Sequence, residues 1–462
     1  MDEIIKQETS NKYFYKKVIR LGLPITLSQL LTSLLAFIDT VMVSGLGDNA
    51  VAAVGIGANF FFLMIMINFG LVSGLAIFFA QFWGTKDITS IHKTFIISII
   101  ASTVVVFVFF IFAQFFSGTI MEIYLNSGEV ADELIVKELG MRYLKIASFS
   151  YFFTAMSFVV NMLMRSVEKV IFPQIVSIIM VLINTFLNYA LITGNFGFPR
   201  MEIRGAAIAT VISSVVSLII FVIYMATTKR EVFRINFRIY KEITRGFVAK
   251  LLKKALPVAL NETLWGLGMT MYLIAFGFIS IDAIASYQIT NQIMGMVWVV
   301  NAGVSSACAI MLGNKLGEGK IEVAKNWGKR FVRLTLIFGV LLGVILFFVS
   351  PYIPNLFGDI SETTKSNIRL LLIVFSFYVP IKFTNAMHII GTLRSGGDTV
   401  FAFIAEVVVL WGIGVPLAFI LSIFTELDLY VIIAIVNVEE IIKFILVNMR
   451  FLTYKWAENL TH

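Results

Sequence analysis

The first residue that could do chemistry is Asp39, in the stretch AFIDTVMVSGLGDNAVA at residues 36–52. The run around it is apolar enough to cross a bilayer, and no basic residue stands beside it. A charge in a membrane helix costs roughly 2.5–3.5 kcal/mol, so it requires a partner, a water-filled cavity or a function. A poorly hydrated carboxylate can hold a proton near neutral pH and release it when water or a cation arrives. Asp39 is therefore a candidate cation-exchange group; the plainer interpretation is an acid that reaches the outer interface.

Two amides and a hydroxyl could surround this acid. Asn184 and Asn188 stand four residues apart in INTFLNYALI, so they share one face of a helix. Thr210, in GAAIAT, belongs to the next predicted helix. These side chains could bind a cation, or they could form interhelical hydrogen bonds worth about 0.6 kcal/mol each. The sequence leaves both interpretations open.

A second group of charges lies in the later part of the chain. Glu262 follows Pro257 by five residues in ALPVALNETLWGLG, and proline bends a membrane helix and exposes its carbonyls. Lys382 and Glu406 stand twelve residues before and after Arg394, so adjacent antiparallel helices would place them at similar depth. We therefore expect a structural Lys382–Glu406 ion pair, which would leave Glu262 free to titrate or to bind a cation.

Polar and aromatic residues near Glu262 could contact an organic ligand. Trp265 follows it by three residues, and DAIASYQITNQIMG places Tyr287, Gln288 and Asn291 along two helical turns. They form either a hydrogen-bonding wall for a ligand or polar packing between helices.

The composition defines the class of protein. Of 462 residues, 59% are hydrophobic and 14% charged, against about 25% charged residues in soluble domains. The net charge of +8 comes from bases in loops between apolar spans, so it reports topology and not a nucleic-acid partner. The lone Cys308 excludes an intrachain disulfide. The scattered polar residues offer no metal-ligand set or nucleophile dyad, so we expect neither an enzyme nor a bound cofactor.

Apolar runs of about 20 residues predict an all-α polytopic membrane protein with twelve transmembrane helices. They are residues 18–43, 51–82, 94–116, 139–164, 170–193, 205–228, 250–276, 283–313, 331–350, 367–392, 399–421 and 428–453. Most Lys and Arg residues fall in the loops on the side of both termini. The positive-inside rule then predicts a multi-pass protein of the cell membrane with both termini cytoplasmic.

An internal repeat divides these helices. A shift of 233 residues aligns Leu23, Pro24 and Leu27 with Leu256, Pro257 and Leu260, and the segment from Asn68 to Gly84 with Asn301 to Gly317. We predict an amino-terminal six-helix lobe at 1–228, a basic cytoplasmic linker at 229–249 and a carboxy-terminal lobe at 250–462. Two bundles of six helices insert the same way up, so a pseudo-two-fold axis along the membrane normal should relate them.

These residues resemble the multidrug and toxic compound extrusion (MATE) family, in particular its NorM-like and DinF-like bacterial members, over essentially all twelve helices. The resemblance is carried by LGLPITLSQL and FIDTVMVSGLG, by the pair AQFWGTKD and LGNKLGEGK, by INTFLNYALI and GAAIAT, and by GTLRSGGDT. It implies an antiporter, driven by sodium or protons, that exports organic and often cationic drugs or metabolites by alternating access. The expected partners are the small organic substrate and the lipid bilayer, with no nucleic acid, for a monomeric chain.

The resemblance also implies roles for individual residues. Asp39 matches the coupling acid of the first helix, and Asn184 and Thr210 match residues beside it that could hold sodium. Asn188 stands where some relatives have an aspartate. Glu262 matches the glutamate of the seventh helix in NorM-type members, and Asn385 stands where those members have a tenth-helix aspartate. The resemblance thus implies that both residues contact the substrate.

One rival function comes from the same wider superfamily. A flippase for lipid-linked saccharides would show a more basic cleft, whereas the acids Asp39 and Glu262 favour cationic cargo.

Overall fold

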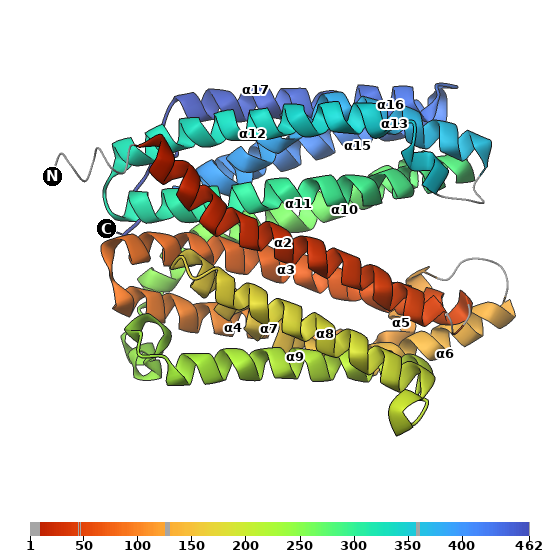
Figure 1. The fold of residues 1–462 in the computed structure, drawn as a ribbon, viewed down its shortest axis with the longest axis horizontal. Coiled ribbons are helices and arrows are strands. Elements are labelled where there is room, and N and C mark those ends of the chain that lie inside the picture. Colours follow the sequence, from red (N-terminus) through yellow and green to blue (C-terminus); the bar gives the residue numbers. More distant parts are fainter. Residues whose placement is uncertain (1–9, 45, 47, 125–129, 357–360, 462) are drawn as a thin grey trace. The chain divides into compact units, whose positions relative to one another are not determined.

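The structure is a computed structural model that describes residues 10–44, 46, 48–124, 130–356 and 361–461. Nearly all of these residues are helical, and they include no β-strand. The α-helices are α2 (Asn11–Ser44), α3 (Asp48–Thr85), α4 (Ile88–Phe115), α5 (Ser117–Tyr124), α6 (Val130–Ala147), α7 (Phe149–Ser166), α8 (Ile171–Thr193), α9 (Glu202–Thr227), α10 (Arg245–Gly277), α11 (Ile281–Gly317), α12 (Ile321–Val349), α13 (Glu362–Ala386), α14 (Thr399–Phe403), α15 (Val415–Phe424), α16 (Leu429–Val436) and α17 (Val438–Leu452) (Figure 1).

The helices confirm the predicted polytopic membrane fold. Within the described ranges, eight helical segments are long and apolar enough to cross a bilayer, and nine if α6 and α7 are counted as one span bent by 44°. Helices α2 and α10 and the consecutive pair α16 and α17 coincide with the three remaining predicted spans. The twelve predicted segments are therefore all helical.

Spatial contacts divide the chain into two compact units. Unit 1 comprises the described residues up to Thr26, residues 80–86 and residues 256–461; unit 2 comprises residues 27–79 and 87–255. In unit 2, α8 packs along α9 and α4 along α7, whereas in unit 1 α12 and α11 both pack on α13. Each unit thus has its own helix packing, and aromatic and aliphatic side chains fill the space between its helices.

Close helix crossings follow the internal repeat. In unit 1, a Cβ on Gly22 of α2 would lie 3.1 Å from the carbonyl oxygen of Gly303 of α11. In unit 2, a Cβ on Gly74 of α3 would lie 2.6 Å from the Cα of Ala255 of α10. The 233-residue shift relates Gly22 to Ala255, so the first helix of each half crosses the second helix of the other half. Such crossings need small residues because the two backbones are almost in contact.

A second aligned pair, Gly84 and Gly317, makes a reciprocal contact within unit 1. A Cβ on Gly84 would lie 2.7 Å from the backbone nitrogen of Glu318, and a Cβ on Gly317 would lie 2.7 Å from the Cα of Gln81. Gly84 thus contacts the turn that contains Gly317, and Gly317 contacts the turn that contains Gly84. Such a reciprocal contact is expected where a local two-fold axis relates two segments.

The end of α3 also holds the carboxy-terminal segment of the chain. Gln81, which is fully buried, donates from Nε2 to the carbonyl oxygens of Ser395 (2.8 Å) and Glu458 (3.1 Å). Its Oε1 accepts from the backbone N–H of Leu460 at 2.5 Å. Trp456 is fully buried and stacks on Phe451 with ring centroids 5.7 Å apart. The carboxy-terminal segment is therefore part of the packed structure of unit 1.

Replacing Gln81 by leucine removes all three of these bonds and leaves buried backbone groups without partners. Since a hydrogen bond contributes about 0.5–1.5 kcal/mol net, we expect the free energy of unfolding in detergent to fall by about 2 kcal/mol. Gln292→Leu, at an exposed position of α11, is the matched control and should change it by less than about 0.5 kcal/mol. Equal effects of the two changes would contradict the role assigned to Gln81.

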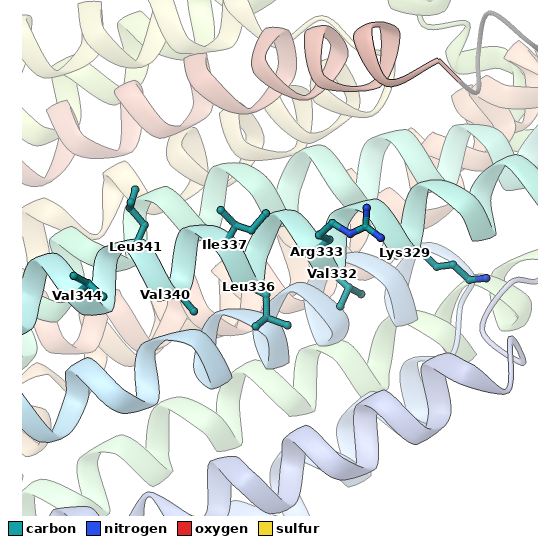
Figure 2. Close-up of a pocket in the computed structure, with 8 residues that line it drawn as sticks. All are labelled: Lys329, Val332, Arg333, Leu336, Ile337, Val340, Leu341 and Val344. Atoms are coloured by element: carbon teal, nitrogen blue, oxygen red, sulfur yellow. The ribbon is translucent and has the colours of Figure 1, made fainter.

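A surface groove runs along one face of α12. It is lined by Lys329, Val332, Arg333, Leu336, Ile337, Val340, Leu341 and Val344 (Figure 2). All of these residues come from a single helix, and all except Val332 are exposed. An apolar face of this kind suits lipid acyl chains, with its two basic residues at one end. The groove offers no converging polar groups and is not the candidate site.

Candidate functional site

The predicted polar residues of α8 and α9 come together in unit 2. Asn188 donates from Nδ2 to Oδ1 of Asn184 at 3.3 Å, and Asn184 donates from Nδ2 to Oγ1 of Thr210 at 3.5 Å. Asn184 and Asn188 are 8% and 3% exposed, so the two amides are buried in strongly apolar helices. Asp39 lies in α2, but its side chain is outside the part of the chain that the structure describes. The cluster supplies amide and hydroxyl oxygens, which are groups that can bind a cation.

The sequence predicted that Glu262 has no charged partner, and the structure contradicts this prediction. Its Oε1 accepts from Nη2 of Arg394 at 2.5 Å, and the two side chains are 12% and 4% exposed. Glu262 comes from α10 after Pro257, and Arg394 follows the π-helix η5 (Met387–Leu393). In the sequence, Arg394 served only as the reference between Lys382 and Glu406, and it was not identified as the partner of Glu262.

The predicted Lys382–Glu406 ion pair is replaced by other contacts. In the described part of the chain, no ion pair within 4 Å joins these residues; Glu406 instead accepts from Nδ2 of Asn261 at 2.5 Å. Lys382 lies over the ring of Phe375, 4.9 Å from its centroid. The prediction assumed regular helices, but η5 and a second π-helix, η6 (Ile404–Val408), intervene. A π-turn contains one more residue than an α-helical turn. Equal numbers of residues from Arg394 therefore do not bring the side chains of Lys382 and Glu406 opposite each other.

Sequence reasoning missed three charged residues of α17. Lys443 lies 3.0 Å from Oε1 of Glu440 and 3.4 Å from Oε1 of Glu439. All three are largely buried, with side chains 3%, 12% and 3% exposed for Lys443, Glu440 and Glu439. The signal was present in VEEIIKFI, where two acids precede a lysine by three and four residues in an apolar span.

The predicted ligand-contacting residues occupy different surroundings. Tyr287 is buried in the core of unit 1 against Phe276, with ring centroids 4.8 Å apart. Asn385 is also buried, and its Nδ2 donates to the carbonyl oxygen and to Oε2 of Glu440, both at 2.8 Å. In contrast, Gln288 and Asn291 are exposed on α11. Trp265 of α10 is half-buried beside the same core.

The buried ionisable residues of unit 1 do not form a metal centre. Among the described residues, no group of three or more His, Cys, Asp and Glu side chains is placed to hold a metal ion. The acids are instead hydrogen-bonded to amides or paired with bases, an arrangement suited to exchanging a proton or to balancing a ligand's charge.

Comparison with known proteins identifies the family of this chain. The MatE family model matches residues 24–190 and 257–420, one segment in each half. The probable multidrug resistance protein YoeA of Bacillus subtilis is 25% identical over 93% of this chain and 91% of its own length. The probable multidrug resistance protein NorM of Thermotoga maritima is 26% identical over 90% of this chain and 87% of its own.

Solved structures share the fold. A crystal structure of a MATE protein in complex with MaL6 superposes with a TM-score of 0.83 at 21% identity and covers 95% of this chain and 97% of that one. A mutant of the Vibrio cholerae MATE transporter VcmN also gives a TM-score of 0.83, at 16% identity, and covers 98% of this chain and 99% of its own. The chain, with one matched segment in each half, therefore belongs to the MatE family of multidrug efflux transporters.

Proposed function

We propose that the protein is a cation-coupled antiporter that exports small organic cations by alternating access. The observation that carries this proposal is the chain of hydrogen bonds from the buried amides of Asn188 and Asn184 to the hydroxyl of Thr210, inside two helices that are apolar enough to cross a membrane. Buried polar groups at membrane depth usually mark an ion or substrate pathway. With Asp39 as the acid of this site, the amides and the hydroxyl would supply neutral oxygens to sodium, or hydrogen bonds to a carboxyl group that exchanges protons.

The nature of the cargo follows from the relatives and from the acids. YoeA and NorM are named as probable multidrug resistance proteins, which supports drug-like cargo and gives no support to a saccharide flippase. We assign the exposed Gln288 and Asn291 of α11 and the half-buried Trp265 of α10 as substrate contacts. The buried Tyr287 and Asn385 support this surface from the core.

The driving force is sufficient for export. A tenfold ion gradient supplies about 1.4 kcal/mol for each ion exchanged. A membrane potential adds about 2.3 kcal/mol per 100 mV for each net charge moved. One-for-one exchange of monovalent cations moves no net charge, so the second contribution requires unequal stoichiometry or a neutral substrate.

The orientation follows from the positive-inside rule. The basic residues of the 229–249 linker and of the loops on the same side favour a cytoplasmic position for both termini. In this orientation, a monomer in the cell membrane would release its organic cargo outside and carry protons or sodium inward.

Efflux from cells tests the function. Cells that produce the protein and are loaded with ethidium should lose the dye faster than cells without it, and an uncoupler or removal of sodium should abolish the difference. Dye retention that is the same in both cell types, with the protein present in the membrane, would contradict export.

A further inference from the structure

One cluster of buried and half-buried charges in unit 1 does not balance. We define the C-terminal charge cluster as four acids and three bases: Glu262, Glu406, Glu439, Glu440, Lys382, Arg394 and Lys443. With every group ionised, the cluster carries one uncompensated negative charge. An uncompensated charge at membrane depth is costly, so the cluster favours uptake of one positive charge.

Glu406 is the acid that lacks a counter-charge. Glu262 is paired with Arg394 at 2.5 Å. Glu440 and Glu439 share Lys443, at 3.0 and 3.4 Å. Among the described residues, Glu406 has only the amide of Asn261 within bonding distance, at 2.5 Å.

The surroundings of Glu406 leave it partly accessible. It lies in the π-helix η6, and it is half-buried, whereas Asn261 is 3% exposed. The charged groups that face it are Glu262 on α10, Arg394 after η5 and Lys443 on α17. All three already have partners of opposite charge or share one. Helical segments with π-turns often occur at functional sites because the wider turn alters the hydrogen bonding of the backbone.

A second observation, at Asn261, indicates that the positive charge taken up by Glu406 is a proton. Its Nδ2 donates to Oε2 of Glu406, but its buried Oδ1 has no hydrogen-bond partner in the structure. An amide offers two donors on nitrogen and an acceptor oxygen. With Glu406 ionised, the NH₂ group donates to the carboxylate. With Glu406 protonated, a turn of the amide lets the carboxyl O–H donate to Oδ1, which satisfies the unpartnered atom.

The ligand set fits a proton better than a metal ion. Hard metal cations are generally surrounded by about six oxygen ligands. The described residues contain no group of three or more metal-binding side chains, and only one amide oxygen beside Glu406 is unpartnered. A proton requires one carboxylate oxygen and one acceptor, and both are present.

We propose that Glu406 is a proton-exchange site of the carboxy-terminal half, with Asn261 as its hydrogen-bond partner in both charge states. The proposal rests on the proposed antiport function and specifies its coupling ion. When the organic cation binds, the Glu406 O–H bond breaks and the proton leaves to water. When the cation departs, the carboxylate takes a proton from water. Glu262, held by Arg394, is then a structural acid.

The pH dependence of ligand binding tests this site. Binding of tetraphenylphosphonium to the full-length protein in detergent should weaken as the pH falls, because protons compete with the cation. Each exchanged proton changes the apparent Kd by up to tenfold per pH unit. In Glu406→Gln the magnitude of the slope of log Kd against pH should decrease by up to one, which corresponds to one exchanged proton fewer. The control Glu426→Gln removes an exposed acid outside the cluster and should keep the wild-type slope.

The outcomes separate this inference from the proposed function. If Asp39→Asn reduces the slope while Glu406→Gln leaves it unchanged, Glu406 is not an exchange site, although coupled antiport stands. A wild-type slope of zero would contradict the proton site at Glu406 and leave only sodium-coupled antiport.

A measurement on the unsubstituted protein covers the case in which Glu406→Gln does not fold. Dicyclohexylcarbodiimide reacts with protonated buried carboxyl groups, and peptide mass spectrometry locates the adduct. We expect labelling of Glu406 that increases as the pH falls and is blocked by tetraphenylphosphonium. Absence of the adduct, or protection by sodium at constant pH, would overturn the assignment of a proton site.

Discussion

Asp39→Asn is expected to reduce ion-driven export of an organic cation to the background of empty vesicles. Asparagine has nearly the same size and keeps hydrogen-bonding capacity, but it can neither release a proton nor offer a full negative charge to sodium. The substitution therefore removes the exchange step while the helix α2 remains intact. The measurement is uptake of labelled tetraphenylphosphonium into proteoliposomes under an imposed ion gradient.

The matched control for this experiment is Glu426→Gln, which removes an exposed acid between α15 and α16. This change should leave transport at the wild-type rate. Export by Asp39→Asn at more than half the wild-type rate, with equal amounts of protein in the vesicles, would show that coupling does not need this carboxylate.

Arg394→Gln is expected to destabilise the protein by about 3–5 kcal/mol. Arg394 and Glu262 are 4% and 12% exposed, and the substitution leaves Glu262 buried without its cation. Removing one member of a buried ion pair costs this much because the remaining charge stays out of water. The measurement is denaturant unfolding in detergent, followed through the tryptophan fluorescence.

The double variant Glu262→Gln and Arg394→Gln separates the ion pair from the packing of the two side chains. With both charges removed, no uncompensated charge is left, so the double variant should be more stable than Arg394→Gln alone. If the two single changes add up in the double variant, the residues are not energetically coupled and the ion pair has no role in stability.

The fold and the polar cluster of unit 2 could be predicted from the sequence because they depend on local patterns. The twelve helical segments follow from apolar runs long enough for a bilayer, which the helices confirm. The four-residue spacing of Asn184 and Asn188 fixed their common face, and the structure joins them to Thr210. The repeat alignment of Gly84 with Gly317 also corresponds to a reciprocal contact.

The charges of unit 1 could not be paired by the same reasoning. The expected Lys382–Glu406 pair relied on counting residues from Arg394, and the π-helices η5 and η6 change that count. Which base faces which acid also depends on how α10 and α17 pack beside these segments, and Lys443 of α17 is the base that pairs with Glu439 and Glu440. Pairing of buried charges is thus a property of helix packing, whereas helix positions are a property of composition.

Transport in proteoliposomes with pH and sodium gradients imposed separately tests the central claim most directly. The account predicts that an inward-directed proton gradient, without sodium, drives tetraphenylphosphonium against its own gradient, and that Glu406→Gln and Asp39→Asn both weaken this movement. Equilibration of the cation without accumulation under either gradient would contradict coupled antiport.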